Sequence, residues 1–307
     1  MRGFVIAKPL LWPTLIGVLL SAGSSFGSAA VQTGKHLLRV SDRVGQANRY
    51  RIAFDMRMRA EYSGSGEPDA RARQLMETLA AGMGLQTAVE YEQKLMEVAG
   101  DGTRTFEVRW YAFEFSGEIG GRPVAPPPGH QESVRDLLSE TARVRTTPTG
   151  RTLDVAYSHP RIARLAQRLA RIEGVAPTYL PEEPVEIGDR WSSMAQFPIG
   201  LGAGGEVRLT LELEHTLVEL REGPDGPFAV IELSGSYSRL QGMEDIGLGV
   251  PMHLQASLTG FNLFDINQGR FSGGHYEVDM FALHAAEGVE IQLTGHADGN
   301  LELLNAP

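Results

Sequence analysis

Apolar and polar residues alternate along several stretches of the chain, most clearly from Tyr50 to Tyr62. One set of alternate positions there is apolar, and the other is charged except at Ala53. This period of two predicts a strand with one face in solvent. Runs of strand character are also found at Val207–Glu214, Phe106–Phe115, Phe228–Tyr237, His253–Phe264, Tyr276–Leu283 and Val289–Thr294. Most are separated by short breaks rich in Gly, Pro, Asn or Asp, which favours an antiparallel sheet.

Two stretches change to helical spacing. Apolar residues form one stripe in residues 69–83, with Pro68 before it and Gly84 after it. A second stripe is found in residues 158–173, where Ser158 is a suitable N-cap and Gly174 a suitable stop. We therefore expect two amphipathic helices. Arginines line the opposite face of the second helix, and we interpret them as its solvated side.

Two parts of the chain also resemble each other in sequence. Leu95-Met96-Glu97-Val98 aligns with Leu217-Val218-Glu219-Leu220 at an offset of 217 − 95 = 122. Three further pairs occur in the same order: Phe106-Glu107-Val108 with Phe228-Ala229-Val230, Thr149-Gly150-Arg151 with Gln268-Gly269-Arg270, and Val44-Gly45 with Ile187-Gly188. This predicts two related β-rich halves, residues 31–176 and 177–307, although the pleat alone makes alternating strands look alike.

The second half opens on Leu180-Pro181-Glu182-Glu183-Pro184-Val185-Glu186-Ile187-Gly188-Asp189-Arg190-Trp191. This stretch is similar to an "LPxxPVxxGDxW" stretch of exported bacterial β-rich proteins of unknown function. The resemblance implies an exported β-rich protein and brings no catalytic residues with it. Independently of it, the prolines predict an extended entry, Gly188-Asp189 a turn, and Trp191 a core anchor.

The first thirty residues have the form of a signal peptide. Arg2 and Lys8 precede an apolar stretch from Leu10 to Ala22, and small residues follow up to Ala30. We expect cleavage near Ala30 and a mature protein in the periplasm or outside the cell. The alternative is a membrane anchor, but the apolar stretch is shorter than the roughly 20 residues that span a bilayer. No other run approaches that length, so the mature chain is not expected to span a membrane.

Composition narrows the possible functions. Lys and Arg number 28 against 38 Asp and Glu, a net charge of −10, and this argues against nucleic acid as a partner. The chain has no cysteine, which excludes disulfides, thiolate metal sites and cysteine nucleophiles. An exported protein without disulfides fits a bacterial envelope.

The sequence shows no constellation that predicts a catalytic, cofactor or metal site, so we assign none. None of the eight histidines forms a helical HExxH or an HxH pair. His215 falls on the apolar side of its strand, where a buried histidine is either a catalytic base or a satisfied core residue. The glycine-rich residues 200–205 precede a strand, unlike a phosphate loop.

These patterns predict a mainly β protein with two related antiparallel halves, either as two packed sheets or as curved half-barrel sheets covered by the two helices. At fold level, the second arrangement resembles the lipoprotein-localisation factors, whose concave apolar face is covered by helices. Methionines at 56, 58, 76, 83 and 96 would give such a face an adaptable surface. As its apolar lining we predict Phe54, Met56, Met58, Met76 and Leu79.

The function predicted first is therefore a non-catalytic envelope protein that binds a lipid, another apolar ligand or another envelope component. A periplasmic hydrolase of unknown substrate is the first alternative. The second is a structural partner of an outer-membrane complex, with exposed sheet edges as its interface. A large apolar cavity would favour a carrier, a cleft with converging acids and a histidine a hydrolase, and a solid core with a free edge a scaffold.

Overall fold

The computed structural model describes residues 34–64, 77, 80–124, 130–159, 179–200, 206–223, 226–241, 252–286 and 289–304. The structure confirms a mainly β, antiparallel protein. The first half holds β1 (Ala47–Gly64), β2 (Met83–Val98), β3 (Arg104–Ile119), β4 (Arg122–Val124), β5 (Thr141–Thr146) and β6 (Thr152–Tyr157), with the helix α2 (His130–Leu138). The second half holds β7 (Arg190–Gly200), β8 (Glu206–Gly223), β9 (Gly226–Gln241), β10 (Met252–Asp265), β11 (Arg270–Ala286) and β12 (Val289–Leu304).

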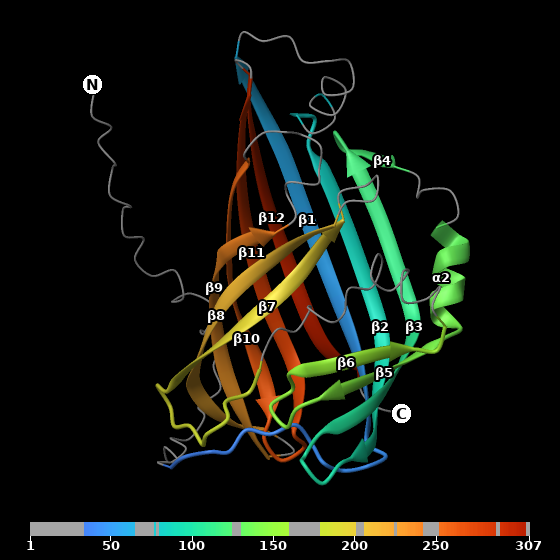
Figure 1. The fold of residues 1–307 in the computed structure, drawn as a ribbon, viewed down its shortest axis with the longest axis vertical. Coiled ribbons are helices and arrows are strands. Elements are labelled where there is room, and N and C mark those ends of the chain that lie inside the picture. The colour runs from blue at the N-terminus through green and yellow to red at the C-terminus, as the bar shows by residue number, and fades with distance from the viewer. Residues whose placement is uncertain are drawn as a thin grey trace, which may run out of the picture. The chain divides into compact units, whose positions relative to one another are not determined.

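All twelve strands belong to one sheet, in the order β6-β5-β3-β2-β1-β12-β11-β10-β9-β8-β7, with β4 added beside β3 (Figure 1). The two halves meet where β1 pairs with β12, from Arg49 opposite Leu304 to Gly64 opposite Val289. β6 and β7 are the two ends of the path and do not pair, so the sheet is open.

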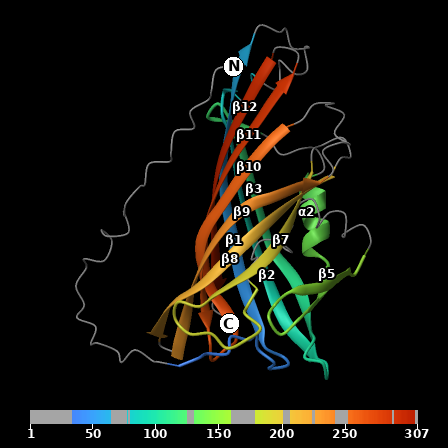
Figure 2. The same cartoon turned by 60° about the vertical axis from the view of Figure 1, so that its left-hand side comes forward.

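The sheet bends strongly about its middle. Val40 N donates to Pro148 O at 3.1 Å, in the turn after β5, and Ser41 N donates to Gly269 O at 2.8 Å, in the turn before β11. In a flat sheet five strand spacings, about 24 Å, would separate β5 from β11. Because neighbouring residues reach both turns, the two sides of the sheet curve toward each other (Figure 2). The structure therefore agrees with the predicted curved sheet rather than with two packed sheets, and both halves share one open sheet.

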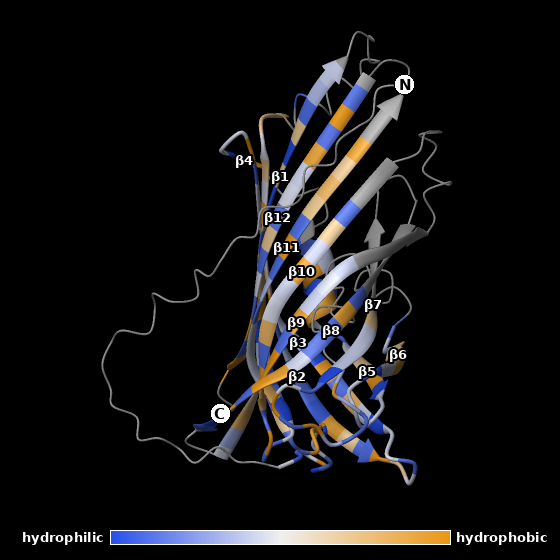
Figure 3. Cartoon of the chain, turned by 90° about the vertical axis from the view of Figure 1, so that its left-hand side faces the viewer, coloured by the Kyte–Doolittle hydropathy of each residue, from blue (hydrophilic) through white to orange (hydrophobic). Residues whose placement is uncertain are grey.

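The two faces of the sheet differ in polarity, as the alternating colours along each strand show (Figure 3). The inner face carries the core that contains Tyr50, Ile52, Tyr91 and Trp110 and continues across to Leu213. The outer face carries ion pairs, among them Arg51 with Glu90 and with Glu114. This is the alternation that the sequence predicts for β1.

Glycines in β12 let inner-face side chains lie close to the backbone. A Cβ at Gly299 would lie 2.5 Å from the ring of Phe54 on β1. A Cβ at Gly295 would lie 3.1 Å from Met280 Cε on β11 and 3.4 Å from Met58 Cγ on β1. Large residues on the two neighbouring strands thus occupy the space above β12, which suits a bent sheet.

The helices are predicted only in part. Glu77 and Ala80 are helical, but Met83 opens β2, so the predicted 69–83 helix extends too far; residues 65–76 and 78–79 lie outside the described residues. Residues 160–173 of the second predicted helix also lie outside them. α2 was not predicted, because its nine residues offer too few apolar positions for a periodic signal. It lies beside β3, with Leu137 buried in the inner-face core. No helix among the described residues has the length and apolarity to cross a bilayer.

The matched sequence blocks occupy equivalent places in the two halves. Gly45 N donates to Leu95 O at 2.8 Å, and Gly188 N donates to Leu217 O at 2.7 Å. The pairing of β2 with β3 shifts between Leu95 and Glu97, and that of β8 with β9 shifts between Leu217 and Glu219. β1-β2-β3 therefore corresponds to β7-β8-β9 in hydrogen bonding and bulge position. Descent of both halves from one unit stays a prediction.

Candidate functional site

Of the five predicted lining residues, the three that the structure describes lie on the inner face, and none of the three lines the cavity described below. Phe54, Met56 and Met58 share the face of Tyr50 on β1, and Phe54 packs against the inner-face core. Met58 and Met280 flank Gly295 in a cross-strand row. Met76 and Leu79 lie outside the described residues. Of the other methionines named above, Met83 is half-buried opposite Met58, whereas Met96 is exposed at the β2 bulge.

A cavity of about 180 Å³ lies on the inner face of the first half. Its walls come from β1, β2, β3, β5 and β6, together with residues 40–41, the start of β11 at Arg270 and Phe271, and Leu301 on β12. Leu95, Phe106, Val108, Val144 and Val155 give it an apolar wall. The same bonds of Val40 and Ser41 that bring the two turns together close this end of the sheet.

Three aromatic residues form one wall of the cavity. Tyr50 lies opposite Tyr91 between β1 and β2, and Tyr91 lies opposite Trp110 between β2 and β3. The rings of Tyr50 and Tyr91 are 5.5 Å apart. Burial raises the pKa of both phenols far above the ordinary range, and the positive charge of Arg270 opposes this rise only at Tyr50. Both phenols are therefore neutral at any physiological pH.

Three buried polar atoms at this cavity have no hydrogen-bond partner: Trp110 Nε1, Thr146 Oγ1 and Arg270 Nε. Trp110 is 3% exposed and Thr146 is 5% exposed. An orphaned buried donor costs about 1–3 kcal/mol, so native proteins rarely leave one without a reason. Indole and guanidinium nitrogens donate and do not accept, so these two positions call for acceptor atoms.

Of the described residues that line the cavity, Arg270 is the only charged one. Its Nη1 donates to Asn48 Oδ1 at 2.8 Å, which is an amide and not a carboxylate. Within the described part of the chain, no carboxylate forms an ion pair with this guanidinium. The site thus combines an apolar wall with one cation that forms no described ion pair; Asp265, the buried carboxylate opposite Arg270 on β10, accepts from Gln268 N.

The equivalent place in the second half is filled. Asn48 opposite Gln93 corresponds to Trp191 opposite His215, because the bonds of Gly45 and Gly188 align the strands. The rings of Trp191 and His215 stack with centroids 5.5 Å apart, and Trp191 Nε1 donates to Tyr179 O at 2.7 Å. Trp191 packs against an end core made of Leu38, Leu180, Val185, Leu217, Ala229, Ile231 and Phe264. The prediction of Trp191 as a core anchor is confirmed.

His215 forms a serine–histidine contact but lacks the surroundings of a catalytic base. Its Nε2 lies 2.7 Å from Ser193 Oγ, and its Nδ1 is buried without a partner. The side chain is fully buried, and burial lowers its pKa to about 4. A Ser–His pair in hydrolysis needs a third group that orients the imidazole and access to substrate. No described carboxylate bonds His215 Nδ1, so among the described residues the pair has no third group to orient the imidazole.

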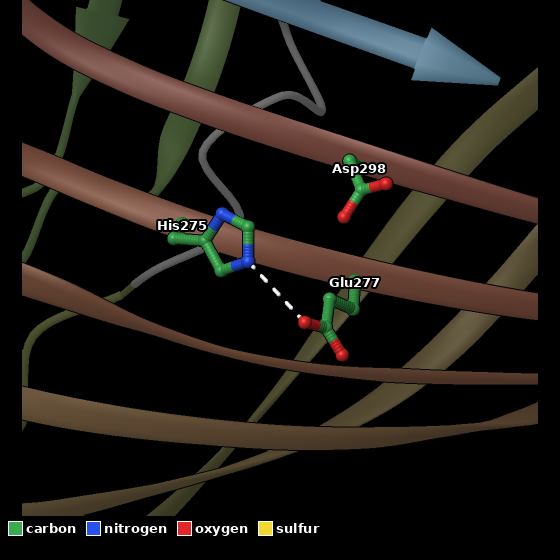
Figure 4. A group of neighbouring side chains, drawn as sticks. All are labelled: His275, Glu277 and Asp298. Atoms are coloured by element: carbon green, nitrogen blue, oxygen red, sulfur yellow. Dashed lines mark hydrogen bonds and ion pairs between the residues drawn. The ribbon is translucent and has the colours of Figure 1, made fainter. Parts of the chain in front are cut away.

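The outer face brings together one group of possible metal ligands. His275 and Glu277 on β11 and Asp298 on β12 place their ligand atoms within 4.8 Å of one another (Figure 4). His275 Nε2 lies 3.4 Å from Glu277 Oε1, and His275 Nδ1 lies 3.0 Å from Asn300 Oδ1. Imidazole and carboxylate oxygens are ligands that a divalent cation accepts. The sequence did not reveal the group, because its members come from two strands.

Sequence reasoning also missed the residues that distinguish the cavity. Trp110 falls in a predicted strand, and Arg270 follows the turn glycine of a repeated block. Arg270 stands out only by comparison with its counterpart Arg151, which is exposed, whereas Arg270 is half-buried against the cavity. This difference in exposure depends on the curvature of the sheet, which cannot be predicted from the sequence pattern.

Comparisons with known proteins do not place the chain in a family: no family model and no curated protein matches it. A structure of lipovitellin that describes its lipid–protein interactions is 12% identical, with a TM-score of 0.48 over 87% of this chain. The chain spans only 26% of that protein. OccK11 (OpdR) of Pseudomonas aeruginosa is 9% identical, with a TM-score of 0.20 over 88% of this chain and 99% of its own. OpdL of the same organism is 10% identical, with a TM-score of 0.20 over 84% of this chain and 99% of its own.

Proposed function

We propose that this chain is an exported, non-catalytic envelope protein that binds an apolar ligand in the cavity of its inner face. The observation that carries the proposal is the cavity itself, about 180 Å³ with a wall of aromatic and aliphatic side chains. Side chains normally pack to fill such a space, because each lost contact weakens the fold. A concave apolar site with a few polar groups is where small ligands bind.

The cavity volume sets the size of what it can hold. Engineered apolar cavities of about 150 Å³ accept one benzene ring, so this cavity holds a ring or several methylene groups. The inner face continues beyond it along β1 and β11 with half-buried Met56, Met58, Val278 and Met280. A ligand with a longer chain would extend over these residues, whose soft side chains adapt to different shapes.

Native mass spectrometry of the protein purified from a bacterial periplasm tests the proposal. We expect a discrete adduct that is lost on denaturation and is identified as a lipid or another apolar molecule. The mass of the chain itself tests export, because cleavage near Ala30 removes residues 1–30. A bare chain that also fails to bind N-phenylnaphthylamine, an uncharged apolar probe, would contradict ligand binding and favour a scaffold role.

A hydrolase is the second candidate, and the contact of Ser193 with His215 is the observation in its favour. It predicts a protein that turns over ester probes and loses this activity in His215→Gln. Binding of an apolar probe without turnover, in both the parent and this variant, would leave the carrier proposal in place.

A further inference from the structure

We infer that the cavity recognises the anionic head group of an amphiphile, a carboxylate or a phosphate, through Arg270 and the indole N–H of Trp110. This inference rests on the proposed function and adds the chemical class of the ligand. Its basis is the set of unpartnered donors at the cavity, because an apolar ligand alone would leave them unsatisfied.

The charge of the cavity selects the sign of the head group. Arg270 is the single charged residue among the described residues that line it, and its Nη1 donates to the Asn48 amide oxygen. A buried cation normally has a carboxylate partner, since an unpaired charge in an apolar site is costly. A bound anion would supply this partner. The guanidinium suits carboxylate and phosphate oxygens, because its donors form a rigid fork that binds two of them.

Arg270 and Trp110 line the same cavity from β11 and β3, which are four strands apart in the sheet, so a shared ligand would lie across the bend between them. Asn48, which accepts from Arg270, lies opposite Gln93, and Gln93 lies opposite Val108, two residues from Trp110 on β3. The Asn48 row is thus about 7 Å along the strands from the row of Trp110. Thr146 pairs with Arg104, whose Nε donates to Ser41 O, so Thr146 lies at the end of the cavity next to the turn before β11. Arg270 and Trp110 are the two strict donors that this cavity offers to a head group.

The surroundings of the turn before β11 strengthen its attraction for anions. Arg43 donates to Asn267 O and Gln268 Oε1, and Arg104 donates to Ser41 O and Gly102 O. These arginines are held by uncharged oxygens. Two carboxylates lie beside them, Asp42, whose charge acts on Arg104, and Asp265, which accepts from Gln268 N, so the positive side chains of Arg43, Arg104 and Arg270 remain in excess. Long-range attraction from such a cluster raises the local concentration of anions.

Matched ligands with one chain and different head groups test the inference. Palmitate, hexadecyl phosphate and hexadecanol are titrated against the protein loaded with uncharged N-phenylnaphthylamine, and displacement gives their affinities. We expect at least one of the two anions to bind roughly 10–100-fold more tightly than the alcohol, the range of a charge-assisted hydrogen bond. Whether palmitate or the phosphate is preferred distinguishes a free fatty acid from a phospholipid as the source.

Single-residue variants identify the side chains that produce the preference for anions. Arg270→Gln should reduce the preference for the anion over the alcohol to within about threefold, and Trp110→Phe should reduce it by about threefold to tenfold. Arg143→Gln is the matched control, since Arg143 lies on β5 between cavity residues Ala142 and Val144 but is exposed. It should leave the preference unchanged. Trp110→Phe keeps the test decisive if Arg270→Gln does not fold.

The possible failures are distinguishable. Equal affinities for all three ligands, or a preference that persists in both Arg270→Gln and Trp110→Phe, would overturn the inference while leaving the proposed function intact. A parent protein that binds neither the probe nor any of the ligands would overturn the proposed function and the inference with it.

Discussion

The two halves of the sheet share the same hydrogen-bonding framework but differ in how their interiors are filled. In the first half Asn48 faces Gln93, and the space beside them is a cavity. In the second half Trp191 faces His215 in a ring stack against the end core. Leu95 and Leu217 occupy the same bulged position and are both fully buried, yet Leu95 lines the cavity and Leu217 belongs to the end core. The size of the side chains at one cross-strand pair, Asn48–Gln93 or Trp191–His215, therefore decides whether this framework holds a cavity or a packed core. We call the first half hollow and the second half solid.

The largest expected loss of stability comes from removing a large side chain in the solid half. Trp191→Ala removes the ring stack, the bond to Tyr179 O and much of the packing on the end core, at a cost of about 3–5 kcal/mol of unfolding free energy. Asn48→Ala at the equivalent position of the hollow half should cost only about 1 kcal/mol, the value of one hydrogen bond. Urea denaturation measures both. Equal losses would contradict the comparison.

Acid should weaken the solid half through His215. Its pKa is about 4 in the folded protein because of burial, and an unfolded histidine titrates near 6.5. Between these values the unfolded state binds more protons, so the unfolding free energy falls as the pH is lowered from about 6.5 to 4, by about 3 kcal/mol in all. Denaturation at a series of pH values measures the slope. His215→Gln should remove this contribution. If the unfolding free energy of that variant still falls with pH as in the parent, another group causes the dependence.

A larger side chain should have different effects on stability in the cavity and in the end core. Val144→Phe places a larger side chain at the cavity wall and should change the unfolding free energy by less than about 1 kcal/mol while blocking ligand binding. Ile231→Phe in the end core, where the parent residue is fully buried, should cost about 1–3 kcal/mol and leave binding in place. Thermal denaturation and probe binding read both variants. A strongly destabilised Val144→Phe would show that the cavity is packed.

The smallest effect on stability is expected at Arg270. Arg270→Met removes an ion without a described carboxylate partner, so the unfolding free energy should change by less than about 1 kcal/mol. Arg104→Met is the structural counterpart, because Arg104 is 6% exposed and donates to two backbone carbonyls; it should cost about 2–3 kcal/mol. A loss of 3 kcal/mol at Arg270 would make it a structural residue.

The sequence predicts the strands well where alternation is long, as in β1 and β3, and less well elsewhere. β6 has only six residues, and β7 contains Ser192, Ser193 and Pro198, which obscure its pattern. Alternation assigns Phe54 and Met58 to the inner face, which is correct, but it carries no information on where along a strand a cavity lies. That place depends on cross-strand neighbours such as Asn48 and Gln93, and hence on register and curvature.

The central claim is that ligand enters the hollow half and not the solid one, and the chain carries a natural reporter for each. Trp110 lines the cavity and Trp191 packs on the end core, and the third tryptophan, Trp12, belongs to the segment that cleavage near Ala30 would remove. The measurement is fluorescence quenching by a fatty acid brominated along its chain, in Trp191→Phe and Trp110→Phe variants of a protein that starts after Ala30. The account predicts strong quenching of Trp110 on binding and none of Trp191. Equal quenching of both, or quenching of Trp191 alone, would contradict it.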